Sequence, residues 1–269
     1  MKRQQRDPWR AILYGVCGLI GFFLMLPIFI VIPMSFSSAS YLQFPPPGLS
    51  LQWYQKYFFD SSWTRPTWVS FQVAIATMLL STFLGVLASF PLVRGKFGFK
   101  GPINTFIVAP IIIPVIVISV VLYGFFSKMG MVGTKLGLVL GHSLLAIPFV
   151  VITVSASLKG FDVTLEKAAM SLGASRIKTF FKITFPLIRP GVISGALFAF
   201  IISFDEIVIS MFICGISSVT LPVKMWEGIR MEINPVIAAV STLLICVSVL
   251  LLSLAEYLRS RGEKIRGSS

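Results

Sequence analysis

The sequence is poor in charge and in the residue types that build catalytic and metal centres. Only 12% of its 269 residues are charged, about half the share that is usual in soluble proteins. Its one histidine, His142, and its three cysteines, Cys17, Cys214 and Cys246, follow no metal-ligand or redox spacing. A metal site needs several converging ligands, so none is predicted, and helix packing is the simplest role for all four residues.

A nucleotide-binding loop is also missing. No segment matches G-x-x-x-x-G-K-[ST], the loop that cradles phosphates. No Ser/His/Asp or paired-acid constellation gathers on one face, which argues against a membrane enzyme. The sequence therefore predicts no catalytic residue, no metal and no cofactor held by this chain.

Apolar residues are abundant instead. They make up 56% of the chain, give a mean hydropathy of +0.89, and come in long blocks. A helix needs about 20 apolar residues to cross a hydrocarbon core of ~30 Å. Six blocks meet this requirement: 11–36, 67–93, 102–126, 135–158, 191–213 and 236–257. The prediction is an all-α integral membrane protein with six transmembrane helices within residues 11–258, between a segment 1–10 and a tail 259–269.

The basic residues lie unevenly between these blocks. If the N-terminal side is taken as inside, 17 of the 23 Lys and Arg residues lie on that side. Positive residues stay on the cytoplasmic side, so both chain ends are predicted to be cytoplasmic. The net charge of +13 has this topological meaning, and no nucleic acid partner is expected, because a nucleic-acid binder gathers its cations on one soluble face.

The longest inside segment, 159–189, predicts a helical hairpin. Thr164 can cap a first helix, Glu166 lies in the turn where it complements the helix dipole, and Gly173 offers a stop. A second short helix is predicted from about 175 to 183, until Pro186 breaks it.

Two interpretations of this segment are equal on its pattern alone. Exposed Ile177, Phe180 and Phe181 offer an apolar surface on which a soluble protein can dock. Alternatively, its Lys and Arg residues lie on anionic lipid.

The segment resembles the loop shared by the permeases of bacterial ABC importers, Glu-Ala-Ala, three residues, Gly, nine residues, Ile-x-Leu-Pro. The matching positions are Ala168, Ala169, Gly173, Ile183 and Pro186. Two positions depart from that pattern, because Lys167 stands in place of Glu and Phe185 in place of Leu. Glu166, one residue earlier, can supply the carboxylate in part.

The resemblance implies a type I ABC importer permease fold in the bacterial inner membrane, surrounded by lipid. The loop would be the coupling helix that docks on an ATP-binding subunit dimer, where ATP is bound and hydrolysed. The other expected partners are a second permease subunit, of a different chain, and a periplasmic substrate-binding protein. The implied ATPase-coupling residues are Glu166, Lys167, Ala168, Ala169, Gly173, Ile183 and Pro186.

Over most of its length the chain is similar to permeases of the spermidine/putrescine type. The likeness is closest in 203–210 and 220–226. Relatives of that kind import polyamines, opines or aminoethylphosphonate, so a small cationic or zwitterionic solute is expected, with polyamine first and the other two as alternatives.

Two acidic residues inside the fifth block are consistent with a cationic solute. Asp205 and Glu206 would cost ~2.5–3.5 kcal/mol each at the membrane centre unless they face a cavity or a partner. On a continuous helix Ser203, Glu206 and Ser210 share one small, polar stripe, whereas Asp205 lies on another face. These three residues and Asp205 are the predicted substrate pathway. The alternative is that both acids are paired within the protein, for example with Lys224.

An unpowered secondary transporter is the other class of function left open. Such proteins often contain spans that are broken by Gly or Pro. Pro110, Pro114 and Pro148 are weak hints of that kind.

Overall fold

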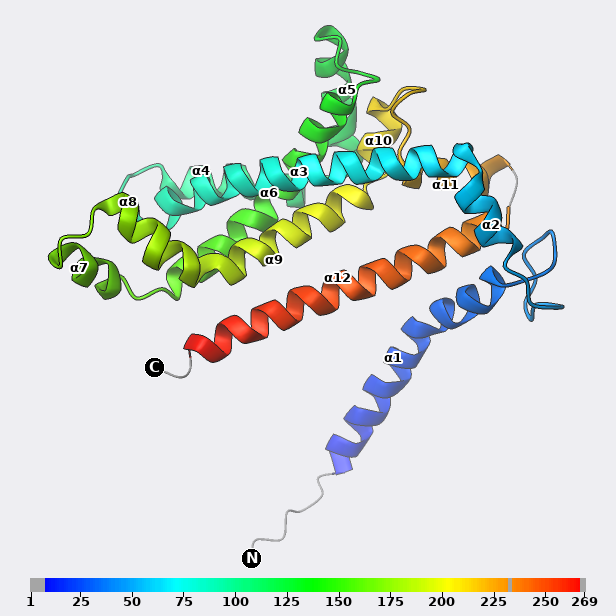
Figure 1. Cartoon of the computed structure of the whole chain (residues 1–269), viewed down its shortest axis with the longest axis horizontal. Coiled ribbons are helices and arrows are strands. Elements are labelled where there is room, and N and C mark those ends of the chain that lie inside the picture. Colours follow the sequence, from blue (N-terminus) through cyan, green and yellow to red (C-terminus); the bar gives the residue numbers. More distant parts are fainter. Residues whose placement is uncertain (1–7, 232–233, 267–269) are drawn as a thin grey trace, which may run out of the picture. The chain divides into compact units, whose positions relative to one another are not determined.

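The computed structural model describes residues 8–231 and 234–266, and these form helices joined by turns and loops. The helices are α1 (Pro8–Ser35), α2 (Gln52–Phe59), α3 (Ser61–Arg94), α4 (Lys100–Ile112), α5 (Val115–Lys128), α6 (Lys135–Lys159), α7 (Thr164–Ser171), α8 (Arg176–Thr179), the π-helix η1 (Phe180–Thr184), α9 (Phe185–Phe204), α10 (Val208–Ile213), α11 (Leu221–Met231) and α12 (Val236–Arg266) (Figure 1). Most of the predicted segment 1–10 and the end of the predicted tail lie outside the described residues.

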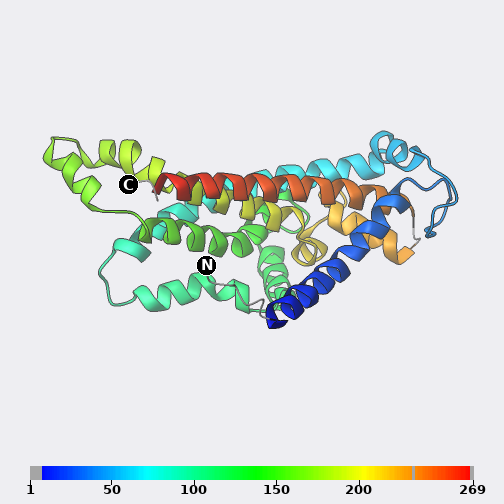
Figure 2. The same cartoon turned by 90° about the horizontal axis from the view of Figure 1, so that it is seen from below.

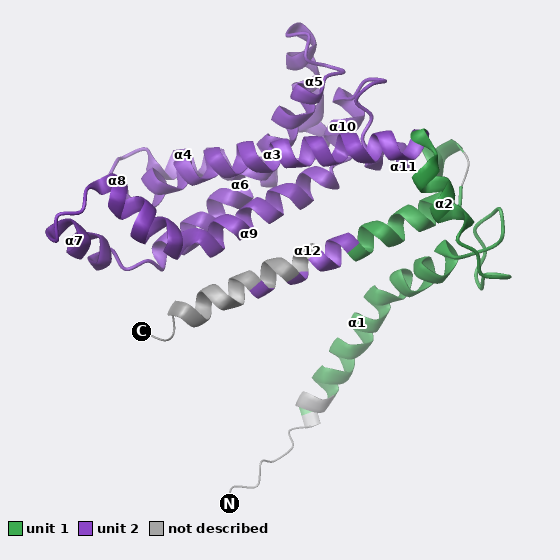
Figure 3. Ribbon diagram, viewed as in Figure 1, with its two compact units in different colours: residues 1–61, 227–246 green, residues 62–226, 247–269 purple. Residues whose placement is uncertain are grey.

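The chain divides into two compact units, 1–61 with 227–246 and 62–226 with 247–269 (Figure 3). In the first unit, aromatic residues of α2 fix the loop that follows α1. Tyr54 and Ser35 share a hydrogen bond of 2.7 Å between their hydroxyls, and Trp53 Nε1 donates to the carbonyl oxygen of Ser37 at 2.8 Å. Phe59, by contrast, is 89% exposed, as expected of a ring that meets the headgroup layer.

The second unit is built around α6, which lies beside α9 in both views (Figures 1 and 2). Small residues let these two helices approach closely. A Cβ added to Gly195 would lie 2.6 Å from Thr153 Oγ1 and 3.2 Å from the Cα atom of Val150. Gly191 and Gly195 are one turn apart and have the small-xxx-small spacing that is common where membrane helices pack.

One predicted span is sharply broken. The block 102–126 forms α4 and α5, which meet at 104°, a bend that is visible in Figure 2. Ile113, with ψ 132°, is extended, as a residue before proline prefers to be, and Pro114 has no N–H with which to continue α4. The prediction of one continuous helix here is wrong, and Pro114 gives the reason.

The fifth block is also interrupted. The helix ends at Phe204 and resumes as α10 at Val208. Residues 205–207 therefore do not continue the helical stripe that was predicted through Ser203, Glu206 and Ser210.

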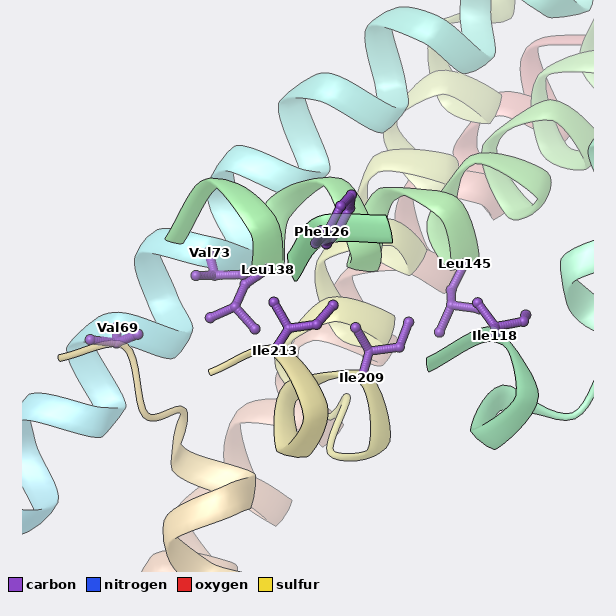
Figure 4. Packing of buried hydrophobic residues seen from close by; sticks show 8 residues of the cluster. All are labelled: Val69, Val73, Ile118, Phe126, Leu138, Leu145, Ile209 and Ile213. Atoms are coloured by element: carbon purple, nitrogen blue, oxygen red, sulfur yellow. The ribbon is translucent and has the colours of Figure 1, made fainter. Parts of the chain in front are cut away.

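The halves that follow the two breaks share a core with α3 and α6. Figure 4 shows Val69 and Val73 of α3, Ile118 and Phe126 of α5, Leu138 and Leu145 of α6, and Ile209 and Ile213 of α10. All are at most 8% exposed. The apolar residues of α5 and α10 therefore hold both broken segments against the long helices.

The described residues contain four helices that are long and apolar enough to cross a membrane, or five if α4 and α5 form one span. The sixth predicted block lies in α12, of which Val236–Leu250 is a shorter apolar helix. The count of six spans stays a prediction.

Candidate functional site

The loop 159–189 folds as a helical hairpin at one end of the second unit. In Figure 1, α7 and α8 extend beyond the ends of α6 and α9. Asp162, rather than the predicted Thr164, caps the first helix, because its carboxylate accepts hydrogen bonds from the N–H of Thr164 at 2.9 Å and from its hydroxyl at 2.6 Å. These two bonds from Thr164, the hydroxyl's first, lower the pKa of Asp162.

Gly173 ends the first helix, as predicted. Its φ of +88° is in the left-handed region, which only glycine adopts without a steric cost. The N–H of Gly173 donates to Met170 O and that of Ala174 donates to Ala169 O, both at 3.0 Å, which is the Schellman pattern of a helix end. The glycine of the permease motif is therefore used for a turn that its neighbours cannot make.

Pro186 does not break the second helix, and that prediction is wrong. Ser175 caps α8 through the N–H of Lys178, and the helix then runs through η1 into α9 without interruption to Phe204. In η1 the bonds reach one residue further back, as from the N–H of Phe185 to Phe180 O. Pro186 follows this π-helix as the second residue of α9, and the helix continues past it.

The hairpin exposes the apolar surface that docking requires. Leu172 is 90% exposed, Ile177 73% and Phe181 64%. Phe180 differs from the prediction because its ring packs against Phe90, with 5.5 Å between ring centroids. Of the implied coupling residues, Lys167, Ala168, Gly173 and Pro186 are exposed, and Glu166, Ala169 and Ile183 are half-buried.

Glu166 is engaged inside the chain. Arg94 Nη1, at the end of α3, lies 2.9 Å from both of its carboxylate oxygens, and the hydroxyl of Thr184 in η1 donates to Oε1. The guanidinium carbon of Arg94 lies 5.4 Å from the ring centroid of Phe90 and 5.3 Å from that of Phe161. We call Arg94, Glu166 and Thr184 the loop joint.

The sequence interpretation missed Arg94. The sequence analysis counted Arg94 only as one of the basic residues that set the orientation in the membrane. Because it lies 72 positions before Glu166 in the sequence, no local pattern indicates their contact. Beside the loop joint lies a cavity of about 350 Å³, lined also by Met170, Arg176 and Thr179.

A second polar group lies where α9 ends. His142 Nδ1 is 2.8 Å from Ser203 Oγ, and His142 Nε2 is 3.0 Å from Ser210 Oγ and 3.7 Å from Glu206 Oε2. His142 is fully buried and Glu206 is 8% exposed. The structure therefore brings together three of the predicted pathway residues, around a histidine to which only helix packing had been assigned. The sequence did offer a sign of this role for His142, because an ionisable side chain inside a span is a functional candidate.

Glu206 and Asp205 have opposite environments. Glu206 accepts hydrogen bonds from the N–H groups of Val208 at 3.0 Å and Ser210 at 3.1 Å, so it caps α10. Asp205 is exposed at the C-terminal end of α9, and no Lys or Arg of the described residues forms an ion pair with it. Of the two acids, Asp205 is exposed and Glu206 is buried by this chain.

Two relatives of this chain are permease proteins of putrescine and spermidine/putrescine transport systems. The chain is 33% identical over 269 residues to the putrescine transport system permease protein PotI of Escherichia coli strain K12, covering 97% of this chain and 94% of that protein. It is 30% identical over 242 residues to the spermidine/putrescine transport system permease protein PotC of Haemophilus influenzae, covering 90% and 93%.

Solved structures agree in fold. A chain of a bacterial ABC transporter involved in the import of the acidic polysaccharide alginate has a TM-score of 0.77 at 15% identity, covering 96% of this chain and 99% of that one. A chain of the MetNI methionine ABC transporter has a TM-score of 0.54 at 17% identity, covering 76% and 94%. The model of one family matches residues 81–263. The chain belongs to the binding-protein-dependent transport system inner membrane component family, the multi-pass permeases of bacterial ABC importers.

Proposed function

We propose that the chain forms half of the membrane channel of an ATP-driven importer for polyamines. The observation that carries this proposal is the exposed apolar surface of α7 and α8, set on a Schellman turn at Gly173, next to spans of a permease fold. Its relatives' substrates, putrescine and spermidine, support the choice of solute.

The proposal assigns ATP to other subunits. A dimer of ATP-binding subunits docks on the hairpin from the cytoplasm, and this chain holds neither ATP nor another cofactor. A second, different permease chain and a periplasmic binding protein complete the complex. Both chain ends are cytoplasmic, in keeping with the charge bias, and residues 11–258 form the membrane domain.

The break after α9 is the proposed meeting point with the cation. The carbonyl end of a helix carries partial negative charge, and the exposed carboxylate of Asp205 adds to it at the end of α9. Broken spans often hold cations at such ends. Glu206 balances the positive end of α10 instead, and with Ser203, Ser210 and His142 it supports the wall behind the pathway.

The test is uptake by the assembled complex in proteoliposomes. Putrescine or spermidine, delivered by the binding protein, should accumulate and should stimulate ATP hydrolysis, whereas a non-hydrolysable ATP analogue should stop uptake. Stimulation by an opine or by 2-aminoethylphosphonate alone would replace the polyamine. Uptake that continues without ATP would overturn the proposal in favour of a secondary transporter, which the comparisons do not favour.

A further inference from the structure

The loop joint connects three segments that are distant in sequence. Arg94 is the last residue of α3, Glu166 lies in α7, and Thr184 is the last residue of η1, directly before α9. A single carboxylate accepts hydrogen bonds from both of the others. Since α7 follows α6 and leads through α8 to α9, the chain alone connects the hairpin to those two spans. Side-chain contacts add α3, through the Arg94–Glu166 pair and through the packing of Phe180 on Phe90.

The ion pair between Arg94 and Glu166 is partly shielded from water and supported by neighbouring rings. The side chain of Glu166 is 12% exposed and that of Arg94 is 29% exposed, so water screens the pair less than it screens a surface pair. The guanidinium is further held over the rings of Phe90 and Phe161, contacts that favour a cation. Its Nε and Nη2 atoms are buried without a hydrogen-bond acceptor. Removing Glu166 would therefore leave a half-buried cation with no anionic partner in the loop joint.

The orientation of Glu166 also changes its expected role. A residue whose two carboxylate oxygens are engaged with Arg94 and Thr184 is not available to an ATPase subunit. The next residue, Lys167, is exposed and faces outward. The carboxylate serves the inside of the permease.

We infer that Arg94, Glu166 and Thr184 act as a rigid coupling joint, through which movement of the docked hairpin displaces α3 together with α9. The inference rests on the proposed function, since it is the ATPase subunits that would move the hairpin. All three are positioning residues, because none of them touches the solute or ATP.

Uptake per ATP hydrolysed tests the joint. In Glu166→Gln and Arg94→Met we expect the ATP-binding subunits to co-purify as before and ATP hydrolysis to continue. Uptake per ATP should fall by about twofold to thirtyfold, the range found for residues along coupling networks. The double exchange Arg94→Glu with Glu166→Arg should restore part of the ratio. Lys96→Gln, a change of charge on an exposed residue that follows α3 and lies outside the hairpin, is the matched control and should leave the ratio unchanged.

A covalent link separates a rigid joint from a contact that opens during transport. Cysteines replace Arg94 and Glu166 in a chain that lacks Cys17, Cys214 and Cys246, and a short bifunctional thiol reagent joins them. A rigid joint predicts that the link raises uptake per ATP above that of the unlinked pair. A link that stops uptake, or single variants with an unchanged ratio, would overturn the inference.

Failure of the proposed function would look different. If the unmodified complex takes up no amine, the proposed substrate is wrong. The joint is still judged by comparing variants with the unmodified complex on whichever solute stimulates ATP hydrolysis. Melting temperatures of the purified variants identify any that misfold, and the linked pair, which does not depend on the buried charge, then decides.

Discussion

Asp162 shows how one exposed carboxylate shapes the start of α7. Hydrogen bonds from Thr164 lower its pKa, so its contribution to stability is complete above the ordinary pKa of an aspartate. The contribution is lost only as the pH falls through the lowered value, and the cap should not change between about pH 5 and 8. In Asp162→Ala we expect faster amide exchange in the first turn of α7, and in Asp162→Asn a smaller increase. Equal exchange in all three proteins would contradict the assigned cap.

Replacing His142 should lower the stability of the membrane region. His142→Leu removes the histidine partner of the buried Ser203 hydroxyl, and one of two partners of the Ser210 hydroxyl, which also donates to Glu206 O. A buried polar group left without a partner costs about 1–3 kcal/mol. We expect a lower melting temperature of the detergent-purified chain, and a smaller decrease for His142→Gln, which keeps a donor and an acceptor. A leucine variant as stable as the original would show that the cluster does not stabilise the fold.

Asp205 and Glu206 can be separated by function. Asp205→Asn removes an exposed charge that bonds no basic residue of the described chain, so folding should be unaffected while the KM for a polyamine rises. Glu206→Gln weakens the cap of α10 and should lower thermal stability first. Kinetics of uptake together with melting curves check both. The reverse pattern would place the pathway at Glu206, as the sequence suggested.

At the scale of elements, the close packing of α6 and α9 makes a sharp prediction. Gly195→Leu puts a side chain where a Cβ already meets Thr153 and Val150, and overpacking of this kind costs about 1–3 kcal/mol. We expect a lower yield and a lower melting temperature. Gly124→Leu in α5, where nothing lies within 4 Å of an added Cβ, is the control and should behave like the original protein.

Local signals predicted the elements that depend on local chemistry. The stop at Gly173 was correct because a left-handed turn depends on the glycine itself. Pro186 was misjudged because a π-helix, which no residue pattern announced, carries the helix past it. The break at 205–207 was missed because Glu206 caps a new helix that tertiary packing of Ile209 and Ile213 holds in place. The helical wheel placed Ser203, Glu206 and Ser210 on one stripe of a continuous helix, whereas the structure brings these three together around His142 across the break.

At the scale of the whole molecule, the orientation in the membrane can be tested with two single cysteines. Single cysteines are placed in a cysteine-free chain at two exposed positions. One replaces Leu172, which is 90% exposed on the hairpin, and the other replaces Ile216, which is fully exposed before α11. An impermeant thiol reagent added outside intact spheroplasts should label position 216 and not position 172, and the pattern should reverse in inverted vesicles. Labelling of position 172 from outside would invert the topology and rule out docking of a cytoplasmic ATPase.

Lys167 places an exposed ammonium on the hairpin, at the position where the permease motif has Glu. Its charge bears on which ATP-binding subunit the proposed docking would accept. Like charges brought together at an interface disfavour the wrong pairing. An ATP-binding subunit with a basic docking groove would attract permeases that carry Glu at this position and would repel this chain. An ATP-binding subunit with an acidic groove would attract this chain and repel those permeases. If the hairpin docks as proposed, the ammonium of Lys167 would therefore favour an ATP-binding subunit with an acidic groove.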